Sequence, residues 1–218
     1  MTVPIAVLIS GNGTNLQAII DAIEAKSLDA RIQLVFSNRP DAYGLVRAQH
    51  HGIATEVLDH KDYPNREAFD EAVVELLRKR GVELVVLAGF MRLLSPVFVK
   101  AYSNRIMNIH PALLPAFPGL HVQKKALEYG VRFSGCTVHF VNEECDQGPI
   151  IIQAVVPVAA DDTVESLSAR IIQQEYRIYP RAIQLYSEGR LRVEGRRVFV
   201  TGLHKEEPPV LYQPPLKG

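Results

Sequence analysis

Strand-like apolar runs alternate with segments of helical period up to Ala88, and this alternation most constrains the fold. The expected strands, rich in Val, Ile and Leu, are Ile5–Ser10, Ile32–Ser37, Thr55–Leu58 and Glu83–Ala88. The helical segments between them are Asn15–Lys26, Ala42–His51 and Arg66–Arg80. Strands that alternate with helices over short links form βαβ units, in which the strands are parallel. We therefore predict an α/β fold with an open, mostly parallel twisted sheet and helices on both faces.

The pattern changes after Gly89. Ser95 and Pro96 suit the N-cap and the first position of a short helix. The other elements that we expect are a strand over 103–109, a helix Val122–Glu128, strands Ser134–Val141 and Pro149–Pro157, a helix from about Asp161 to Tyr186, and a hairpin of Leu191–Val193 and Arg197–Thr201. Pro180 should kink or restart the long helix, because proline lacks the N–H donor and clashes with the preceding turn.

Length and charge set broad limits on what the chain can do. At 218 residues it suits one domain, which we place at 1–205, followed by an irregular Pro-rich tail at 206–218. Lys and Arg together number 24, as do Asp and Glu, which argues against a broad surface for nucleic acid or an anionic membrane. Only Cys136 and Cys145 carry thiols, and the first residues lack the basic segment of a secretory signal. We therefore expect free thiols and a cytoplasmic protein.

Asn108 and His110 stand at the end of an expected strand, directly before a loop that three prolines stiffen. Alternate side chains of an extended chain share a face, so the amide and the imidazole point the same way. In open α/β sheets, ligands bind beyond the carboxyl ends of the strands. The pair therefore indicates a site, although polar residues that merely satisfy loop carbonyls would give the same pattern.

Asp146 follows His110 by 36 residues, in the turn between two expected strands. A carboxylate beside His110 would favour the imidazolium and fix which ring nitrogen faces a substrate. Asn108 can donate to a developing oxyanion. Because this trio contains no nucleophile, it fits a reaction in which the substrate supplies one, such as an amine that attacks an acyl or formyl carbon. Three unrelated loop residues are the alternative.

A second candidate site is the glycine-containing segment Ser10–Leu16 between the first expected strand and helix, which we call the phosphate loop. Gly11 and Gly13 let the chain turn tightly and expose N–H groups at the positive end of a helix, which suits a phosphate. The segment lacks the Gly-Lys-Ser/Thr of a Walker loop and the third glycine of a dinucleotide fingerprint. The alternative is a tight turn with Thr14 or Asn15 as the helix cap.

Other residues carry weaker signals. Gly89–Leu94 follows the fourth expected strand, and its apolar residues beside Arg92 suit a flat heterocycle with an acidic tail as well as they suit a capped core strand. Glu175 is most simply part of a solvated polar face. The histidines and cysteines lack the spacing of a zinc site, so we expect no metal. Cys145 has no basic neighbour along the chain to activate its thiol.

Four motifs in order resemble the phosphoribosylglycinamide formyltransferases, the folate-dependent third-step enzymes of purine synthesis, over about residues 3–195. The motifs are Ser10–Leu16, Leu87–Leu94, Asn108–Pro115, and Val138–Val141 leading to Asp146–Pro149. The resemblance implies the Rossmann-like formyltransferase fold and transfer of formyl from 10-formyltetrahydrofolate, as co-substrate, to the amine of glycinamide ribonucleotide. The expected partners are these small molecules, without nucleic acid or membrane. The chain is expected to be a monomer or a homodimer.

The resemblance also assigns roles to residues. Asn108 and His110 would stabilise the tetrahedral oxyanion, with His110 as proton donor. Asp146 would hold the histidine charged and assist proton movement from the amine to the leaving folate nitrogen. The residues implied in binding glycinamide ribonucleotide are Gly13, Thr14 and Asn15 at the phosphate, and Gln173, Gln174 and Glu175 on the long helix. The residues implied in the folate pocket are Arg66, Met91, Arg92, Leu93, Leu94, Asn108, Asn142, Glu143, Glu144, Cys145 and Asp146.

The sequence departs from the family pattern at a few positions. Ile172 stands where the family often has a polar residue, and Ala116 stands where a basic residue is common. These changes bear on contacts to the substrates and leave the Asn, His and Asp trio intact. The residues after Gly195 match no pattern of the family.

Three other functions compete with this reading. Formyltetrahydrofolate deformylase and methionyl-tRNA formyltransferase share the formyl-handling loop. The first is expected to carry an N-terminal regulatory domain and the second a C-terminal nucleic-acid domain, and 218 residues leave room for neither. A non-catalytic phosphosugar-binding domain is the rival from another class, but it would have no use for an Asn, a His and an Asp that converge beyond the phosphate loop.

Overall fold

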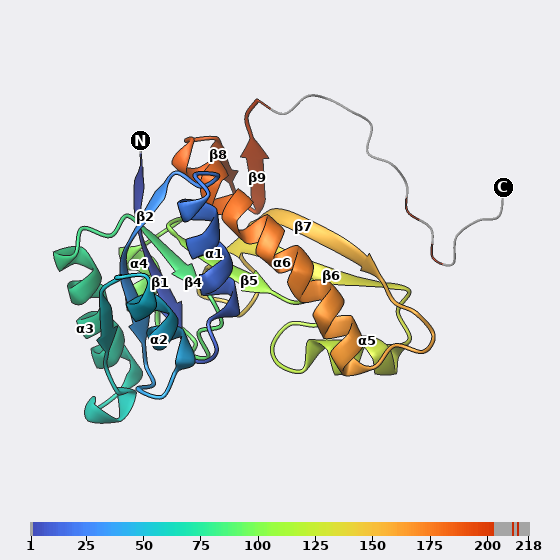
Figure 1. Ribbon diagram of the computed structural model, residues 1–218, viewed down its shortest axis with the longest axis horizontal. Helices are drawn as coiled ribbons and strands as arrows, with labels where there is room; N and C mark the ends of the chain where they lie inside the picture. Colours follow the sequence, from blue (N-terminus) through green and yellow to red (C-terminus); the bar gives the residue numbers. More distant parts are fainter. Residues whose placement is uncertain (1, 203–210, 212, 214–218) are drawn as a thin grey trace.

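The computed structural model describes residues 2–202, 211 and 213, so the expected tail at 206–218 lies outside the described residues except at Leu211 and Gln213. One sheet runs through the described molecule in the order β3-β2-β1-β4-β5-β6-β7-β9-β8 (Figure 1). The strands are β1 (Val3–Ile9), β2 (Ala30–Ser37), β3 (Thr55–Val57), β4 (Leu84–Leu87), β5 (Ile106–His110), β6 (Phe133–Phe140), β7 (Ile150–Pro157), β8 (Leu191–Glu194) and β9 (Arg197–Val200). The helices are α1 (Thr14–Glu24), α2 (Tyr43–His50), α3 (Arg66–Lys79), α4 (Pro96–Ala101), α5 (Val122–Tyr129) and α6 (Val164–Ser187), with a 3-10 turn at His60–Asp62.

The prediction of an open, mostly parallel sheet is confirmed. Strands β3, β2, β1, β4 and β5 are joined by parallel pairs, as βαβ units require. Strands β5, β6 and β7 are joined by antiparallel pairs. The expected terminal hairpin forms β8 and β9, and it extends the sheet through a parallel bridge between Ile150 and Arg197.

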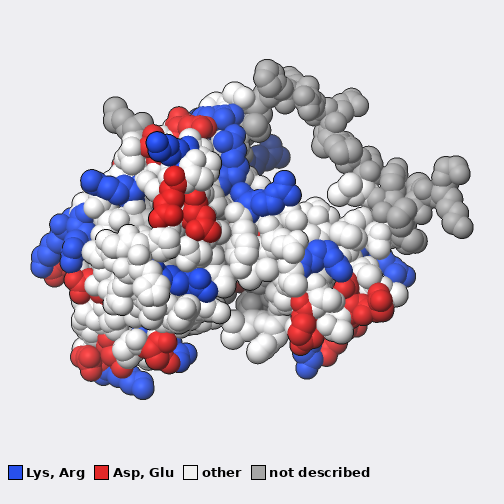
Figure 2. Space-filling model, in the orientation of Figure 1, with Lys and Arg blue, Asp and Glu red and all other residues white. Residues whose placement is uncertain are grey.

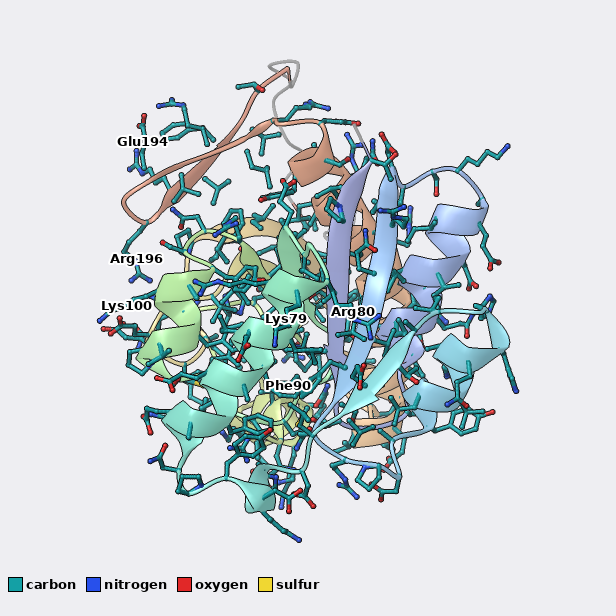
Figure 3. The ribbon with its side chains drawn as sticks, turned by 90° about the vertical axis from the view of Figure 1, so that its left-hand side faces the viewer. Lys79, Arg80, Phe90, Lys100, Glu194 and Arg196 are labelled. Carbon is teal, nitrogen blue, oxygen red and sulfur yellow. The ribbon has the colours of Figure 1, made fainter. Side chains whose placement is uncertain are left out.

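Helices cover both faces of the sheet because side chains alternate along each buried strand. On β1, Ile5 and Val7 belong to a core cluster with α1, α2 and α6. Ala6 and Leu8 point the other way, into a cluster with α3 and α4. Figure 3 views the molecule from this second side, with α3 and α4 in front of the sheet and Phe90 near its end.

The longest helix, α6, is continuous from Val164 to Ser187, so of the two expected effects of Pro180, a kink or a restart, the restart does not occur. Its first turn is fixed by a capping box, in which Thr163 Oγ1 accepts from the Ser166 N–H at 3.2 Å and Ser166 Oγ accepts from the Thr163 N–H at 2.9 Å. Pro180 is buried, and the neighbouring Tyr179 is fully buried in the core. Core packing therefore offsets the hydrogen bond that proline cannot donate.

The surface agrees with the balanced composition. Figure 2 shows basic and acidic side chains interspersed over the visible face. None of the helices in the described part of the chain combines the length and apolar character needed to cross a membrane.

Candidate active site

The sheet register aligns the loops that carry the candidate residues. Leu8, Leu87, Asn108 and His139 lie in one row across β1, β4, β5 and β6. Strands β1, β4 and β5 are parallel, so the loops that follow them leave the same edge of the sheet. The phosphate loop, the 88–95 segment and the Pro loop at 111–119 therefore meet beside Asn108.

His139, the partner of Asn108 on the neighbouring strand β6, orients the Asn108 amide. The Asn108 Nδ2 atom lies 3.3 Å from His139 Nε2, and His139 Nδ1 lies 2.8 Å from the Phe140 carbonyl oxygen. A carbonyl only accepts, so Nδ1 carries the proton and the neutral ring accepts from Asn108 through Nε2. Burial lowers the pKa of His139, which favours this neutral form. One Asn108 N–H is thereby engaged, and the other can donate to a substrate oxygen.

Both ring nitrogens of His110 face acceptors. Nε2 lies 2.9 Å from the Phe117 carbonyl oxygen of the Pro loop, and Nδ1 lies 3.4 Å from Asp146 Oδ2. The exposed fractions of the His110 and Asp146 side chains are 6% and 11%, so the pair is shielded from water. A neutral imidazole has one N–H and cannot donate to both acceptors, whereas the imidazolium can. His110 therefore lies between a loop carbonyl and the Asp146 carboxylate.

The turn that carries Asp146 is fixed by close backbone approach. Asp146 has a φ of 54°, a left-handed conformation that Asp tolerates better than most residues. A Cβ at Gly148 would overlap the Phe140 carbonyl oxygen at the end of β6, so only glycine fits there. The Gly119 N–H donates to Asp146 Oδ2 at 2.9 Å and joins this turn to the Pro loop.

The Pro loop is also tied to the sheet from behind by two side chains that the sequence reasoning did not single out. Thr137 Oγ1 donates to the Ala112 carbonyl oxygen at 2.7 Å and accepts from the Leu114 N–H at 3.1 Å. Gln153 Nε2 donates to the Leu114 carbonyl oxygen at 2.9 Å. These bonds hold the first half of the loop in place. The sequence signal for them is slight, since a polar residue inside a strand usually marks its solvent face.

A cavity of about 240 Å³ opens between the loops that follow β1 and β4. It is lined by Ser10, Gly11, Asn12, Gly13, Thr14, Asn15, Ala88, Gly89 and Met91. Gly13 is the N-cap of α1, with a φ of 72°, and the helix start has no side-chain cap. The alternative in which Thr14 or Asn15 caps this helix is therefore wrong. The first N–H groups of α1 keep their capacity to bind an anion in this cavity.

Glu175 is buried rather than part of a solvated polar face, which corrects the simpler interpretation of this residue. It is 7% exposed, and its Oε2 accepts from Asn15 Nδ2 at 2.8 Å. Burial raises the pKa of Glu175, and the hydrogen bond from Asn15 acts in the opposite direction. The structure brings Asn15 and Glu175 together, whereas Gln173 is exposed and lies roughly 200° around the helix from Glu175. Gln174 is partly buried, between these two directions.

The 88–95 segment contains the candidate folate residues Met91 to Leu94, and its backbone is held at Met91 and Ser95. Ser10 Oγ accepts from the Met91 N–H at 2.8 Å, and Asp70 Oδ2 accepts from the Ser95 N–H at 2.5 Å. Burial raises the pKa of Asp70. The Met91 and Leu93 side chains are 67% and 61% exposed. Large apolar side chains held open to solvent in this way suit contact with a ligand.

Two arginines are candidates for the folate tail, Arg92 within this segment and Arg66 at the start of α3. The Arg92 guanidinium lies 4.8 Å from the centroid of the Phe69 ring, and its Nε is buried with no partner among the described residues. Arg66 pairs with Glu67 at 3.5 Å, and both Arg66 and Arg92 act electrostatically on Asp70. Leu94 is partly buried against the core cluster on the α3 side.

The residues before Asp146 are less closely organised. Asn142 Oδ1 accepts from the Glu144 N–H at 3.2 Å, while Glu143 lies 3.9 Å from Lys100 on α4. Cys145 is exposed as a residue, but its thiol is partly buried. This partial burial, and after it the charge of Asp146, raises the pKa of the thiol. A raised pKa works against a nucleophilic thiolate.

A larger hollow of about 560 Å³ lies between α3 and α4, and none of the candidate residues lines it. We therefore place the nucleotide part of the site at the smaller cavity, which Gly13, Thr14, Asn15 and Met91 line. Within the described residues, no group of three or more His, Cys, Asp or Glu side chains is arranged to hold a metal ion.

The sequence matches the family model described as formyl transferase over residues 3–183. It is 48% identical to the phosphoribosylglycinamide formyltransferase of Escherichia coli over 91% of this chain and 93% of that protein. It is also 51% identical to a trifunctional purine biosynthetic protein of Gallus gallus, of which the match spans 19%.

Solved structures of enzymes from this family are also similar to the chain. A glycinamide ribonucleotide transformylase from Symbiobacterium toebii has a TM-score of 0.90 at 55% identity, over 91% of this chain and 94% of that one. A phosphoribosylglycinamide formyltransferase from Coxiella burnetii has a TM-score of 0.89 at 44% identity, over 93% of this chain and 95% of that one.

Proposed function

Because this chain belongs to the formyl transferase family, we propose that it transfers the formyl group of 10-formyltetrahydrofolate to the amine of glycinamide ribonucleotide. The products are formylglycinamide ribonucleotide and tetrahydrofolate, in purine biosynthesis. The observation that supports this most is the grouping of Asn108, His110 and Asp146: His110 faces Asp146, and His139 lies against both Asn108 and Asp146. A module that only bound a phosphosugar would have no need of this trio.

The proposed reaction begins when the amine nitrogen attacks the formyl carbon, so that a C–N bond forms and the carbonyl electrons move to oxygen. The free N–H of Asn108 and an N–H of His110 stabilise this oxyanion. Asp146 keeps His110 charged and assists the proton that leaves the amine on its way to the folate nitrogen. The bond between the formyl carbon and that nitrogen then breaks, and tetrahydrofolate leaves with the proton.

His110 must exchange one hydrogen bond before it can act. Its Nε2 donates to the Phe117 carbonyl, and Phe117 has a φ of 51° in the left-handed region. A developing oxyanion is a stronger acceptor than a neutral carbonyl. We therefore propose that the transition state competes with Phe117 for this N–H, which favours the transition state over the ground state.

The two substrates would occupy adjacent parts of the site. Gly13, Thr14 and Asn15 would bind the nucleotide phosphate and its neighbouring groups, with Glu175 beside them. Gln173 is the weakest of the proposed nucleotide contacts, since its side chain is exposed. The folate would lie along 91–94 and 142–146, with Arg66 and Arg92 toward its acidic tail.

Three coarser features complete the proposal. Residues 1–205 form the catalytic domain, and 206–218 lie outside it. The protein is cytoplasmic, and it works as a monomer or a homodimer on small molecules without a metal. A size measurement in solution would distinguish the two oligomeric states.

The test is release of tetrahydrofolate from 10-formyltetrahydrofolate, with and without glycinamide ribonucleotide, followed by mass analysis of the nucleotide. We expect release that requires the nucleotide, together with a gain of one formyl mass on it. Release of formate without the nucleotide would instead identify a deformylase. Absence of release under both conditions would favour a phosphosugar-binding module.

A further inference from the structure

The helix α2 packs against the back of the phosphate loop and contacts two consecutive peptide groups of it. The Gly44 N–H donates to the Gly11 carbonyl oxygen at 3.0 Å. Arg47 Nε donates to the Asn12 carbonyl oxygen at 2.9 Å, and Arg47 Nη2 donates to Asn12 Oδ1 at 3.2 Å. Both carbonyls are therefore turned toward α2.

The direction of these carbonyls fixes the direction of the next two N–H groups. In a planar trans peptide, the C=O and the following N–H point to opposite sides. Since the Gly11 and Asn12 carbonyls face α2, the N–H groups of Asn12 and Gly13 face away from it. Neither N–H donates a hydrogen bond to another described residue, and both residues line the cavity. A pair of free donors is thus turned away from α2 on the loop that borders the cavity.

Arg47 also brings a charge close to a cavity whose lining residues are all uncharged. Its Cδ lies 3.6 Å from the position that a Cβ on Gly13 would take, and its guanidinium lies 5.0 Å from the centroid of the Tyr43 ring. The loop and α2 approach each other closely because each carries a glycine at the contact: a Cβ on Gly13 would lie 2.7 Å from the Gly44 Cα. The guanidinium is therefore held one peptide group behind the donors.

We propose that Arg47 is a positioning residue for the nucleotide phosphate: it turns the Asn12 peptide so that the Gly13 N–H is free for the phosphate, and it supplies positive charge behind the loop. The inference rests on the proposed function, because it concerns the phosphate of that nucleotide. A phosphate in a cavity of uncharged residues needs such a cation, since burying an unpaired charge is costly.

The test compares Arg47→Gln and Arg47→Lys with Arg78→Gln, which removes the same charge from an exposed position on α3. The quantities measured are the KM for each substrate, kcat, the unfolding midpoint, and competitive inhibition by inorganic phosphate. For Arg47→Gln we expect the nucleotide KM to rise about tenfold and phosphate inhibition to weaken by a similar factor, with the folate KM and kcat changed less than about twofold. The nucleotide KM of Arg47→Lys should lie between those of the wild type and Arg47→Gln, because lysine keeps the charge but loses the planar guanidinium.

Several outcomes would overturn the inference. An unchanged nucleotide KM in a folded Arg47→Gln protein would mean that the loop does not need Arg47. A parallel loss of affinity for both substrates with a lowered unfolding midpoint would indicate a purely structural contact, and Arg47→Lys serves in its place if the Gln variant does not fold. If the wild-type protein neither used the nucleotide nor responded to phosphate, the proposed function itself would fail, regardless of Arg47.

Discussion

At the scale of single residues, the side chains proposed to act on the substrate can be predicted from the sequence, whereas the side chains that orient them cannot. The alternation that puts Asn108 and His110 on one face is visible in the strand. The structure places His110 against Asp146 and links Asn108 to Asp146 through His139. The role of His139 has no such signal, because nothing in the sequence shows that β5 and β6 pair Asn108 with it. Glu175 has the local pattern of a solvated face but is buried, because α6 packs against α1, and its partner Asn15 is 160 residues away in sequence.

We expect His139→Leu to lower kcat by about tenfold or more, because the Asn108 amide loses the acceptor that orients it. His139→Gln should retain more activity, since its side-chain oxygen can accept from Asn108. Steady-state kinetics of the two variants checks this. Equal and nearly normal kcat values in both would remove His139 from the positioning of Asn108.

His139 also predicts how stability depends on pH. Burial depresses the folded pKa of His139 below the ordinary 6.5, so the unfolded chain binds more protons between these values. Its contribution to the free energy of unfolding is therefore present above pH 6.5 and is lost as the pH falls through the folded pKa. Chemical denaturation from pH 7.5 to 5 should show a smaller loss for His139→Leu than for the wild type. Parallel curves for the two proteins would contradict the assignment.

Glu175 should act with the opposite sign. Burial raises its folded pKa above the ordinary 4.5, so between these values the folded chain binds the extra proton. Its contribution to the free energy of unfolding then falls as the pH rises through that window. Glu175→Gln removes this loss, so its stability should decline less between pH 4.5 and 7, while its nucleotide KM rises. A nucleotide KM equal to that of the wild type would exclude Glu175 from substrate binding.

At the scale of elements, the strands and helices follow from periodicity, but their joints depend on contacts that the sequence does not display. Tyr179 on α6 illustrates this: its hydroxyl lies 2.9 Å from the carbonyl oxygens of both Leu87, the last residue of β4, and Met107 in β5. Packing of this kind carries α6 through Pro180, where local rules predict a kink or a restart. The turn at Gly148 depends in the same way on close approach to β6.

We expect Gly148→Ala to displace the Asp146 turn, because the added methyl group would overlap the Phe140 carbonyl oxygen, a backbone atom that cannot rotate away. Activity should fall by about 10²-fold or more, with a lower unfolding midpoint, since His110 would lose its carboxylate partner. Gly119→Ala provides a comparison, because its Cβ would meet no atom within 4 Å and only its φ of 81° is strained. Wild-type activity in Gly148→Ala would show that the turn tolerates displacement.

At the scale of the whole molecule, the parallel half of the sheet was predictable and the order of its remaining strands was not. Short βα links force β1 to β5 into a parallel arrangement. The bridge that attaches the β8–β9 hairpin to β7 joins residues 47 positions apart and has no local signal. Asn108, His110 and the glycine loop after β1 lie on the predictable side of this boundary. His139 and Asp146 depend on the antiparallel strands β6 and β7, and Glu175 depends on the packing of α6.

The central claim is that Asn108, His110 and Asp146 carry the transfer, and Asp146→Asn tests it most directly. The measurement is single-turnover formation of formylated nucleotide by the wild type and the variant, with the affinity for each substrate determined separately. We predict a rate lower by about 10²–10⁴-fold with both affinities nearly unchanged, because the amide cannot hold His110 charged or take up the amine proton. A near-normal rate in a correctly folded Asp146→Asn protein would contradict the account.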